Sequence, residues 1–460
     1  MKYNLSIAGI HYELLKKHLY PGDNKEAVAI ALCGRHKMKD STKLLVHELV
    51  LIPYDQCSIR EPDLITWSTT IIVPYLEKAM NKGFAILKIH SHPTGFRSFS
   101  RTDDLSDKEL FESVFGWTGD EEVHASAVML PDGEIFGRIF EMNLNHTPID
   151  KVSVVGDDLL FWEKNKAEEI QEFSLRTAQA FGEGTTSRLS KLKIAVIGCS
   201  GTGSPIIEQL TRLGVGHLVL IDPDIVEKKN LNRIINSTME DALKKEYKVN
   251  VIKRAIDKTG LGTTVSVYNN NLFDGSNIIN EVASCDVIFG CVDSVDGRHL
   301  LNQISTFYLV PYFDLGVKLT SDGKGGIDQI MGTVNYVQPG GSSLRTRGVY
   351  TSEELRAASI YRTNIEHYNE QRKSGYIVNV NVESPAVITI NTQLASMALN
   401  EFLARIHPFR YDSNSEFAIT RISFTDFYIQ NLSDGDPDNY LLKFVGRGNM
   451  TPLLNMPELK

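Results

Sequence analysis

Three glycines and one acidic residue around position 200 have the types and the spacing needed to hold a nucleotide. Gly198, Gly201 and Gly203 follow one short apolar run, and Asp222 ends the next apolar run along the chain. Glycines let phosphate oxygens approach the backbone, and the helix that follows offers free N–H groups and a positive dipole end. A carboxylate at the tip of the second strand can accept hydrogen bonds from ribose hydroxyls. The pattern predicts a strand–turn–helix–strand unit that binds an adenosine nucleotide.

Side chains beyond Asp222 favour ATP over a nicotinamide dinucleotide. The glycines are spaced G-x-x-G-x-G, whereas the dinucleotide fingerprint is G-x-G-x-x-G. Asn230, Arg233 and Lys248 follow, and the two cationic groups can neutralise a triphosphate but have little use in a nicotinamide site. Asp293 ends a later strand-like run, at the edge where an open α/β sheet places its ligands, and is a candidate ligand for Mg²⁺.

The run from Asp222 to Arg233 reads D-x-D-x-V-x-x-x-N-L-x-R, and residues 172–406 resemble the ubiquitin-activating, ThiF/MoeB-type adenylation fold. The resemblance implies a Rossmann-like doubly wound sheet and a homodimer in which an arginine, matched by Arg176, reaches into the partner subunit's site. The segment from Ser384 to Phe402 resembles the family's closing helix. Arg233, Lys248 and Arg176 would act in catalysis. The ATP- and Mg²⁺-binding residues that the resemblance implies are Gly198, Gly201, Gly203, Asp222, Asp224, Asn230, Arg233, Lys248 and Asp293.

A second group of residues, His90, His92 and Asp103, has the types needed to hold a metal ion. Two histidines at i and i+2 of an extended segment point to the same side. Asp103 supplies a hard third ligand once the intervening loop turns back. Two nitrogens and one oxygen suit Zn²⁺ with an open fourth position for water, which is the pattern of catalytic rather than structural zinc.

Two further side chains could act on a substrate at this metal. Glu48, on an earlier strand, is the candidate general base, although nearby Glu61 also carries a carboxylate. Ser100 can donate a hydrogen bond to the oxyanion as an attacked carbonyl becomes tetrahedral. The spacing H-x-H-P-x6-S-x-x-D after an apolar strand resembles the motif of JAB/MPN (JAMM) metalloproteases. That resemblance implies cleavage of a ubiquitin-like protein at or near its C-terminal tail.

The chain departs from the activating enzymes in its cysteines. Those enzymes usually form a thioester on a cysteine beyond a Q-P-G-G segment, but no cysteine follows Cys291 here. Three alternatives remain: the acyl-adenylate is handed to another protein's nucleophile, a loop hydroxyl takes the acyl group as an oxygen ester, or Cys199 or Cys291 does so. We expect Cys199 and Cys291 to have a structural role, since buried cysteines usually pack as small hydrophobes. The candidate hydroxyls are those of Ser342, Ser343, Thr346, Thr351 and Ser352.

Composition limits the class of protein. A net charge of −9 without a long basic run makes nucleic acid an unexpected partner. No apolar stretch reaches membrane-spanning length and no signal peptide begins the chain, so we expect a soluble cytoplasmic protein. Five scattered cysteines predict neither a disulfide framework nor a zinc ribbon.

The 460 residues should form more than one domain. We expect a JAB/MPN metalloprotease domain of α/β class over residues 1–150, a helical linker over 151–190, and a ThiF-like adenylation domain with a strand-rich C-terminal extension over 191–460. Within the first domain, the elements expected are a strand at Lys43–Pro53, a helix at Trp67–Asn81, a strand at Phe84–Ile89 and a hairpin at His124–Glu141.

Together these features predict an enzyme of the bacterial ubiquitin-like conjugation type. One part would adenylate the C-terminus of a ubiquitin-like protein with ATP and Mg²⁺, and the other would process or deconjugate the same protein with Zn²⁺. A conjugating-enzyme-like acceptor would be a further partner. Two alternatives are activation of a sulfur carrier for cofactor biosynthesis and, of another class, a nucleotide-sensing scaffold with relic sites.

Overall fold

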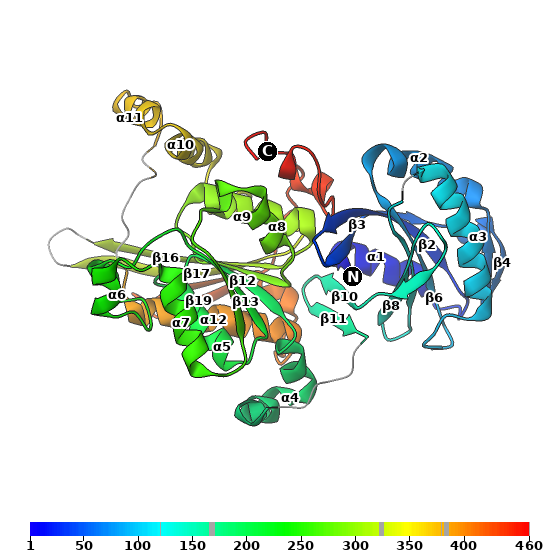
Figure 1. The fold of residues 1–460 in the computed structure, drawn as a ribbon, viewed down its shortest axis with the longest axis horizontal. Helices are drawn as coiled ribbons and strands as arrows, with labels where there is room; N and C mark the ends of the chain where they lie inside the picture. Colours follow the sequence, from blue (N-terminus) through cyan, green and yellow to red (C-terminus); the bar gives the residue numbers. More distant parts are fainter. Residues whose placement is uncertain (120, 165–170, 322–325, 379, 381–385, 460) are drawn as a thin grey trace. The chain divides into compact units, whose positions relative to one another are not determined.

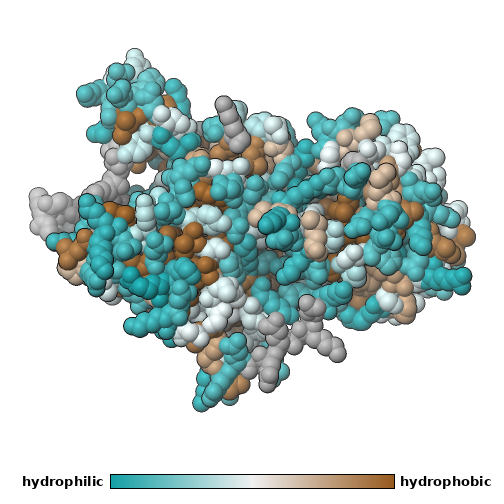
Figure 2. Space-filling model, viewed as in Figure 1, coloured by the Kyte–Doolittle hydropathy of each residue, from teal (hydrophilic) through white to brown (hydrophobic). Residues whose placement is uncertain are grey.

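The computed structural model describes residues 1–119, 121–164, 171–321, 326–378, 380 and 386–459, and these form two compact units (Figure 1). The first unit comprises Met1–Lys166, Phe307–Leu309 and Lys443–Asn455, and the second comprises Ala167–Thr306, Val310–Leu442 and Met456–Lys460. Hydrophilic residues cover most of the face seen in Figure 2, and apolar residues occur there in small separate groups. Among the described helices, none combines the length and the apolar character needed to cross a membrane.

The first unit is built on a nine-stranded sheet in the order β11-β10-β1-β3-β2-β6-β7-β8-β9. Alternate residues of each strand face opposite sides, so the sheet has one apolar core under α1 (Gly9–Leu19) and another under α2 (Val73–Lys82) and α3 (Arg101–Thr118). The strands are β1 (Lys2–Ala8), β2 (Val28–Lys37), β3 (Ser41–Leu51), β6 (Ala85–Ser91), β7 (His124–Met129), β8 (Ile135–Phe140), β9 (His146–Pro148), β10 (Lys151–Val155) and β11 (Leu159–Glu163), and a separate ribbon pairs β4 (Cys57–Glu61) with β5 (Leu64–Trp67).

The second unit is a mixed α/β fold of the Rossmann-like kind. Its eight-stranded sheet has the order β14-β13-β12-β15-β16-β17-β18-β19, in which β12 to β16 are parallel and β17 to β19 antiparallel. The parallel part follows the doubly wound order, which brings a topological switch point between β12 and β15. The strands are β12 (Lys193–Ile197), β13 (His217–Ile221), β14 (Thr264–Tyr268), β15 (Val287–Gly290), β16 (Tyr312–Ser321), β17 (Ile327–Val337), β18 (Ile419–Ser423) and β19 (Tyr428–Leu432).

Most helices of the second unit lie between its strands along the chain, and α4 precedes the first of these strands. The glycine turn leads from β12 into α5 (Gly203–Arg212), and the expected closing helix is α12, which begins at Ile388 after the extended residue Val387. Residues 384 and 385 of the expected segment lie outside the described residues. The helices are α4 (Leu175–Leu189), α5, α6 (Met239–Lys244), α7 (Lys248–Thr259), α8 (Ser276–Ala283), α9 (Val295–Tyr308), α10 (Ser352–Thr363), α11 (Ile365–Lys373) and α12 (Ile388–Ile406).

The helical linker expected over residues 151–190 is wrong in its first part. Residues 151–163 form β10 and β11, because Val152 and Val154 bury their side chains in the first core while the strand pairs in parallel with β1. Residues 165–170 of the expected linker lie outside the described residues, and α4 begins at Leu175.

A second difference concerns the C-terminal segment. Lys443–Asn455 was expected to extend the adenylation domain, but it belongs to the first unit. The ring of His47 lies 2.6 Å, through Nδ1, from the carbonyl oxygen of Val445, and the guanidinium of Arg447 lies 4.5 Å from the ring centroid of Phe84. Both contacts join residues more than 350 positions apart, and no local pattern in the sequence predicts them.

Candidate functional sites

The glycine turn after β12 is shaped by close backbone contacts. Gly198 has a φ of +88°, and a side chain on it would meet the carbonyl oxygen of Cys291 at 2.4 Å. A Cβ on Gly203 would lie 1.8 Å from the carbonyl oxygen of Gly198, so only glycine fits where the turn enters α5. The turn therefore requires glycine at both positions, and it lies at the carboxyl edge of the sheet, where α5 begins.

Asp222 lies beside this turn and is fixed in place by the backbone. Its carboxylate accepts hydrogen bonds from the N–H of Cys199 (2.7 Å) and the N–H of Asp224 (2.9 Å). Lys248 Nζ, at the start of α7, lies 2.6 Å from Asp224 Oδ2 and 3.7 Å from Asp222 Oδ1. Burial raises the pKa of the Asp222 carboxyl, and the Lys248 ammonium opposes that shift. The structure thus gathers Asp222, Asp224 and Lys248 at one end of β13.

Arg233 and Asn230 reach the same region in different ways. The Arg233 side chain lies against the turn, since a Cβ on Gly201 would be 3.5 Å from its Cδ, and its guanidinium donates to the carbonyl oxygen of Lys229 at 2.8 Å. Asn230 is buried, and its amide oxygen accepts from the N–H of Glu227 at 3.0 Å. Asn230 therefore caps its own helical turn, which holds Arg233 in position.

Asn391 is a residue near the turn that sequence reasoning missed. It lies buried in the first turn of α12, and a Cβ on Gly201 would meet its amide nitrogen at 2.4 Å. Asn391 is one of several polar residues in α12, and its approach to Gly201 spans 190 residues of chain, so no local pattern in the sequence singles it out.

Asp293 and Arg176 lie outside this group of contacts. Asp293 is exposed and follows β15, the strand whose last residue, Gly290, pairs with Ile197 immediately before the turn. Its role as a Mg²⁺ ligand stays a prediction. Arg176 is exposed on α4, ahead of the amino end of β12, and donates to Gln179 at 3.0 Å. Its role in a partner subunit also stays a prediction.

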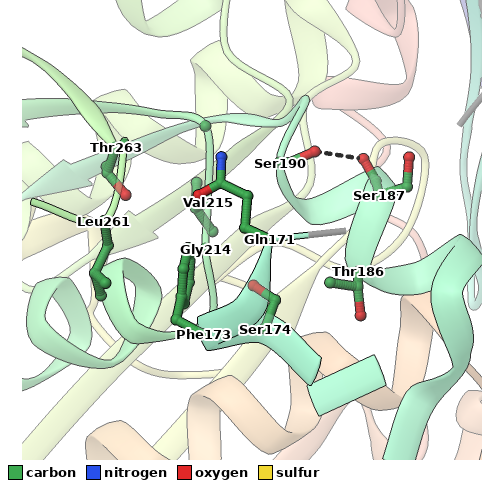
Figure 3. A pocket seen from close by; sticks show the side chains of 12 residues that line it. Gln171, Phe173, Ser174, Thr186, Ser187, Ser190, Gly214, Val215, Leu261 and Thr263 are labelled. Carbon is green, nitrogen blue, oxygen red and sulfur yellow. Dashed lines mark hydrogen bonds between the residues drawn. The ribbon is translucent and has the colours of Figure 1, made fainter. Parts of the chain in front are cut away.

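A cavity of about 200 Å³ lies in the second unit but away from the turn (Figure 3). Gly216 and Thr263, which line it, precede β13 and β14, so the cavity is at the amino edge of the sheet. Hydroxyl, amide and apolar groups line it, and its described lining contains no charged side chain. A triphosphate needs cationic partners, so this cavity is not the nucleotide site.

In the first unit the structure brings together the three residues expected to bind a metal. His90 Nε2 lies 2.9 Å from Asp103 Oδ1, His92 Nε2 lies 3.5 Å from Asp103 Oδ2, and the two Nε2 atoms are 3.1 Å apart. All three residues are buried. Zinc bonds of about 2.0–2.1 Å put neighbouring ligands of a tetrahedral site about 3.4 Å apart. The donor atoms therefore fit Zn²⁺ in type and in separation.

The acid beside this cluster is Glu26, so the choice of Glu48 as its general base is not supported by the geometry. Oxygen and nitrogen atoms of Glu26, His90 and His92 lie within 4.8 Å of one another. Glu26 is 5% exposed, and burial raises the pKa of its carboxyl to about 7. Glu48 instead forms an ion pair with Lys78 of α2.

Strand register explains the difference. β2 and β6 are antiparallel with Val28 opposite His90, so Glu26, two residues before Val28, is level with His92 and on the same face. Glu48 of β3 is opposite Leu32, which is opposite Ile86. Four residues of strand, about 13 Å, separate Ile86 from His90. The other acid near Glu48 in the sequence, Glu61, pairs through its carboxylate with Lys25.

Ser100 holds the helix that carries Asp103. Its Oγ donates to Asp103 Oδ2 at 2.7 Å and accepts from the N–H of Asp103 at 3.1 Å, which forms a capping box at the start of α3. Burial would raise the pKa of the Asp103 carboxyl, but hydrogen bonds from His90 and His92 outweigh it and hold that pKa well below its usual range. Ser100 thus orients a candidate ligand, and its role towards an oxyanion stays a prediction.

Four of the five candidate acyl acceptors, Ser342, Ser343, Thr346 and Thr351, form side-chain hydrogen bonds within the second unit. Ser342 Oγ donates to Asp434 and accepts from Arg347 Nε, and Ser343 Oγ donates to Asp438 Oδ2 at 2.7 Å. Both serines are 2% exposed. Thr346 bonds to Ser343, Thr351 caps α10, and Ser352 opens that helix.

The two cysteines are also poor candidates. Cys199 is buried in the glycine turn and Cys291 follows β15. Burial raises the pKa of the Cys199 thiol well above its usual value and that of the Cys291 thiol to about 12. Because the thiolate is the nucleophile, neither side chain is prepared for acyl transfer.

Comparison with known proteins identifies the second unit. The model of the ThiF family matches residues 174–432. The chain belongs to the ThiF family. The match spans the glycine turn, the Asp222–Lys248 group, the loop that carries Ser342 and Ser343, and α12, so residues 174–432 are a ThiF-family adenylation domain. The match does not extend to residues 1–173.

Curated relatives resemble part of that domain. The SAMP-activating enzyme E1 of Haloferax volcanii is 34% identical over 125 residues, which are 27% of this chain and 45% of that protein. Ubiquitin-like modifier-activating enzyme 5 of Drosophila willistoni is 26% identical over 33% of this chain and 38% of its own length. The adenylyltransferase and sulfurtransferase UBA4 of Candida albicans is 31% identical over 30% of each protein. The chain thus spans less than half the length of these relatives.

Among solved structures, E. coli MccB in complex with MccA-N7isoASN matches 59% of this chain and 74% of its own, with a TM-score of 0.46 and 18% identity.

Proposed function

We propose that the second unit adenylates the C-terminal carboxylate of a ubiquitin-like protein or sulfur carrier, and that the first unit is a zinc-dependent protease acting on the same protein. Membership of the ThiF family, with Asp222, Arg233 and Lys248 gathered at the glycine turn, carries the first part. The cluster of His90, His92 and Asp103 supports the second.

In the proposed adenylation, backbone N–H groups of the turn and of the α5 N-terminus receive the phosphates of ATP. Asp222 accepts hydrogen bonds from the ribose hydroxyls, and Arg233 and Lys248 neutralise phosphate charge. Asp293 would bind the accompanying Mg²⁺. A carboxylate oxygen of the carrier attacks the α-phosphorus, the bond to the bridging α–β oxygen breaks, and pyrophosphate leaves with that electron pair. The product is an acyl-adenylate.

Release of the acyl group by hand-off to another protein is the favoured next step. Ser342 and Ser343 are buried and bonded to carboxylates, and burial disfavours the thiolates of Cys199 and Cys291. A nucleophile from a conjugating-enzyme-like or sulfur-donating partner would therefore attack the acyl carbon and displace AMP. We include a homodimer with Arg176 at the partner's site in this proposal.

In the proposed protease, His90, His92 and Asp103 hold Zn²⁺, which when bound supplies Lewis-acid polarisation of water and of a peptide carbonyl. Glu26 takes the proton of the attacking water and returns it to the leaving amine. Burial raises the pKa of the Glu26 carboxyl to about 7 in the metal-free protein, and a bound cation would lower that pKa towards the range of an ionised base. Ser100 orients Asp103 through the hydrogen bond from its Oγ to Asp103 Oδ2. Its single hydroxyl proton would have to leave that bond in order to be donated to the oxyanion.

Sulfur-carrier activation is kept as a second candidate for the carrier, because one similar protein is named an adenylyltransferase and sulfurtransferase. The two classes can be separated by adding purified proteins of each, all ending in Gly-Gly, to an ATP–pyrophosphate exchange assay. Exchange that depends on one class identifies the carrier. The absence of exchange with every protein in the panel would oppose the adenylation proposal.

The protease is tested by metal content. We expect purified wild-type protein to retain about one equivalent of zinc, and His90→Ala to lose it. His146→Ala is the matched control, because His146 of β9 is exposed. Zinc retained by His90→Ala would contradict the proposed metal site.

A further inference from the structure

Three charged side chains are buried together beside the His90–His92–Asp103 cluster. Lys88, Asp107 and Arg138 are 3%, 0% and 4% exposed. Lys88 Nζ lies 2.7 Å from Asp107 Oδ1, and the Nη2 and Nε atoms of Arg138 lie 2.7 and 3.2 Å from Asp107 Oδ2. Both oxygens of Asp107 are thus held by cations from two different strands, β6 and β8.

The pair Lys88–Asp107 repeats the geometry of the pair His90–Asp103. Lys88 precedes His90 by two residues on β6 and therefore faces the same side, towards α3. Asp107 follows Asp103 by four residues on α3, which is one helical turn. Two strand residues span about 6.7 Å and four helix residues about 6 Å. Strand and helix therefore meet at two matched points, 2.7 Å apart at one and 2.9 Å at the other.

Arg138, on β8, makes further contacts with the same helix. Besides Asp107 it pairs with Asp104, and its guanidinium lies 3.8 Å from the ring centroid of Phe99. Phe99 comes immediately before Ser100, the N-cap of α3, and Asp104 comes immediately after Asp103. One guanidinium therefore contacts residues on both sides of the segment that presents the Asp103 carboxylate.

This arrangement is a costly way to obtain stability alone. Neighbouring positions on the same face, such as Ile86 and Phe111, are apolar and fully buried. Buried ion pairs pay for the desolvation of both charges, and apolar residues of similar volume often serve stability as well or better. Ion pairs instead specify the register between the helix and the strand, because their charged groups meet at one register only.

We propose that Lys88, Asp107 and Arg138 are positioning residues that fix the register of α3 on β6 and so hold Asp103 at metal-binding distance from His90 and His92. This inference rests on the proposed zinc site of the first unit. Residues that orient metal ligands typically change affinity by about 10–100-fold when replaced. We expect a loss of zinc affinity of that size from breaking the network.

The test uses the full chain and measures the zinc dissociation constant by competition with a chelating indicator. Lys88→Met and Asp107→Asn should each weaken zinc binding by about 10–100-fold. Lys37→Met is the matched control, because Lys37 is ion-paired with Glu122 in the same unit but exposed, and it should bind zinc like the wild type. The visible spectrum of the Co²⁺-loaded protein should change in the two network variants and not in the control.

A double variant separates positioning from stability. Lys88→Met with Asp107→Leu removes both charges of that pair and leaves Arg138 paired with Asp104, so it should fold even if a single variant does not. We expect it to have a melting temperature near that of the wild type without metal and still to bind zinc at least 10-fold more weakly. Wild-type zinc affinity and an unchanged Co²⁺ spectrum in a folded double variant would overturn the positioning role. If the wild type itself binds no zinc, both the inference and the proposed protease are wrong; if it binds zinc and His90→Ala does not, the protease site stands whatever the network variants do.

Discussion

Lys248 Nζ lies 2.6 Å from the Asp224 carboxylate and on the same side as Asp222, directly beyond the end of β13. A buried ammonium between two carboxylates is available to a phosphate only if it exchanges one of these partners. In the proposed nucleotide site, the Asp222 and Asp224 carboxylates therefore neutralise the Lys248 ammonium until ATP binds.

Replacing Lys248 should weaken ATP binding selectively. Hydrogen bonds to charged groups contribute about 1.5–3 kcal/mol, which corresponds to a roughly 10–150-fold rise in the dissociation constant for Lys248→Met. Lys253→Met is the matched control, because Lys253 is on the same helix and pairs with Asp257 at the surface. Calorimetric titration with ATP and Mg²⁺ measures both, and equal affinities would remove Lys248 from the site.

The glycines of the turn should differ in their tolerance of a methyl group. Gly203→Ala places Cβ 1.8 Å from a backbone oxygen and should abolish ATP binding, because the backbone must move. Gly201→Ala meets the end of the Asn391 side chain, which can rotate, and should weaken binding less. Gly184→Ala has open space around it and serves as the control. The same ATP titration would refute this order if Gly203→Ala bound normally.

Glu26 and Glu48 should have opposite phenotypes. Loss of a general base typically lowers the rate by about 10²–10⁴-fold, so we expect Glu26→Gln to retain zinc but to lose cleavage of a ubiquitin-like protein carrying a C-terminal extension. Glu48→Gln should cleave normally, because its partner is Lys78. A damaged Glu48→Gln variant together with an active Glu26→Gln variant would restore the assignment made from sequence.

The buried carboxyl of Glu26 should also affect stability in the metal-free protein. Its folded pKa of about 7 is above the ordinary value of 4.5, so the folded state binds more protons than the unfolded state in this range. Stability is therefore lost as pH rises from about 4.5 to about 7, by up to about 3 kcal/mol. We expect the melting temperature of Glu26→Gln, relative to the wild type in chelator, to be higher at pH 8 than at pH 5. A constant difference across that range would contradict the raised pKa.

Ser343→Ala should reduce stability without preventing acyl transfer. It leaves Asp438, 3% exposed, without the hydrogen bond from Ser343 Oγ, at a cost of about 1–3 kcal/mol. Ester formation on the enzyme would be detected as a covalent, alkali-labile adduct with the carrier by denaturing gel. An adduct that forms in the wild type and is absent in Ser343→Ala would contradict the hand-off mechanism and would support an oxygen ester on Ser343.

The sequence was sufficient for elements whose signals are local. The glycine spacing placed the turn between β12 and α5, the hairpin expected at His124–Glu141 is the β7–β8 pair, and His90 and His92 were assigned to one face by strand periodicity alone.

The sequence was not sufficient where contacts between distant segments of the chain determine the position of a residue. Glu26 reaches the histidines only because β2 is antiparallel to β6 at a register that the sequence does not encode locally. The same limit applies to β10, which joins the sheet through β1, and to Asn391, which reaches Gly201 from α12. In each case the decisive partner is far along the chain.

Nucleotide choice at the glycine turn is the most direct test of this account. Titration calorimetry of the full chain should show that ATP with Mg²⁺ binds at one site per chain and that NAD⁺ does not. Arg233→Ala should lose most of that affinity, while Arg212→Ala, which alters an exposed arginine paired with Glu208 on α5, should retain it. Binding of NAD⁺ in place of ATP, or ATP binding unchanged in Arg233→Ala, would contradict the assignment.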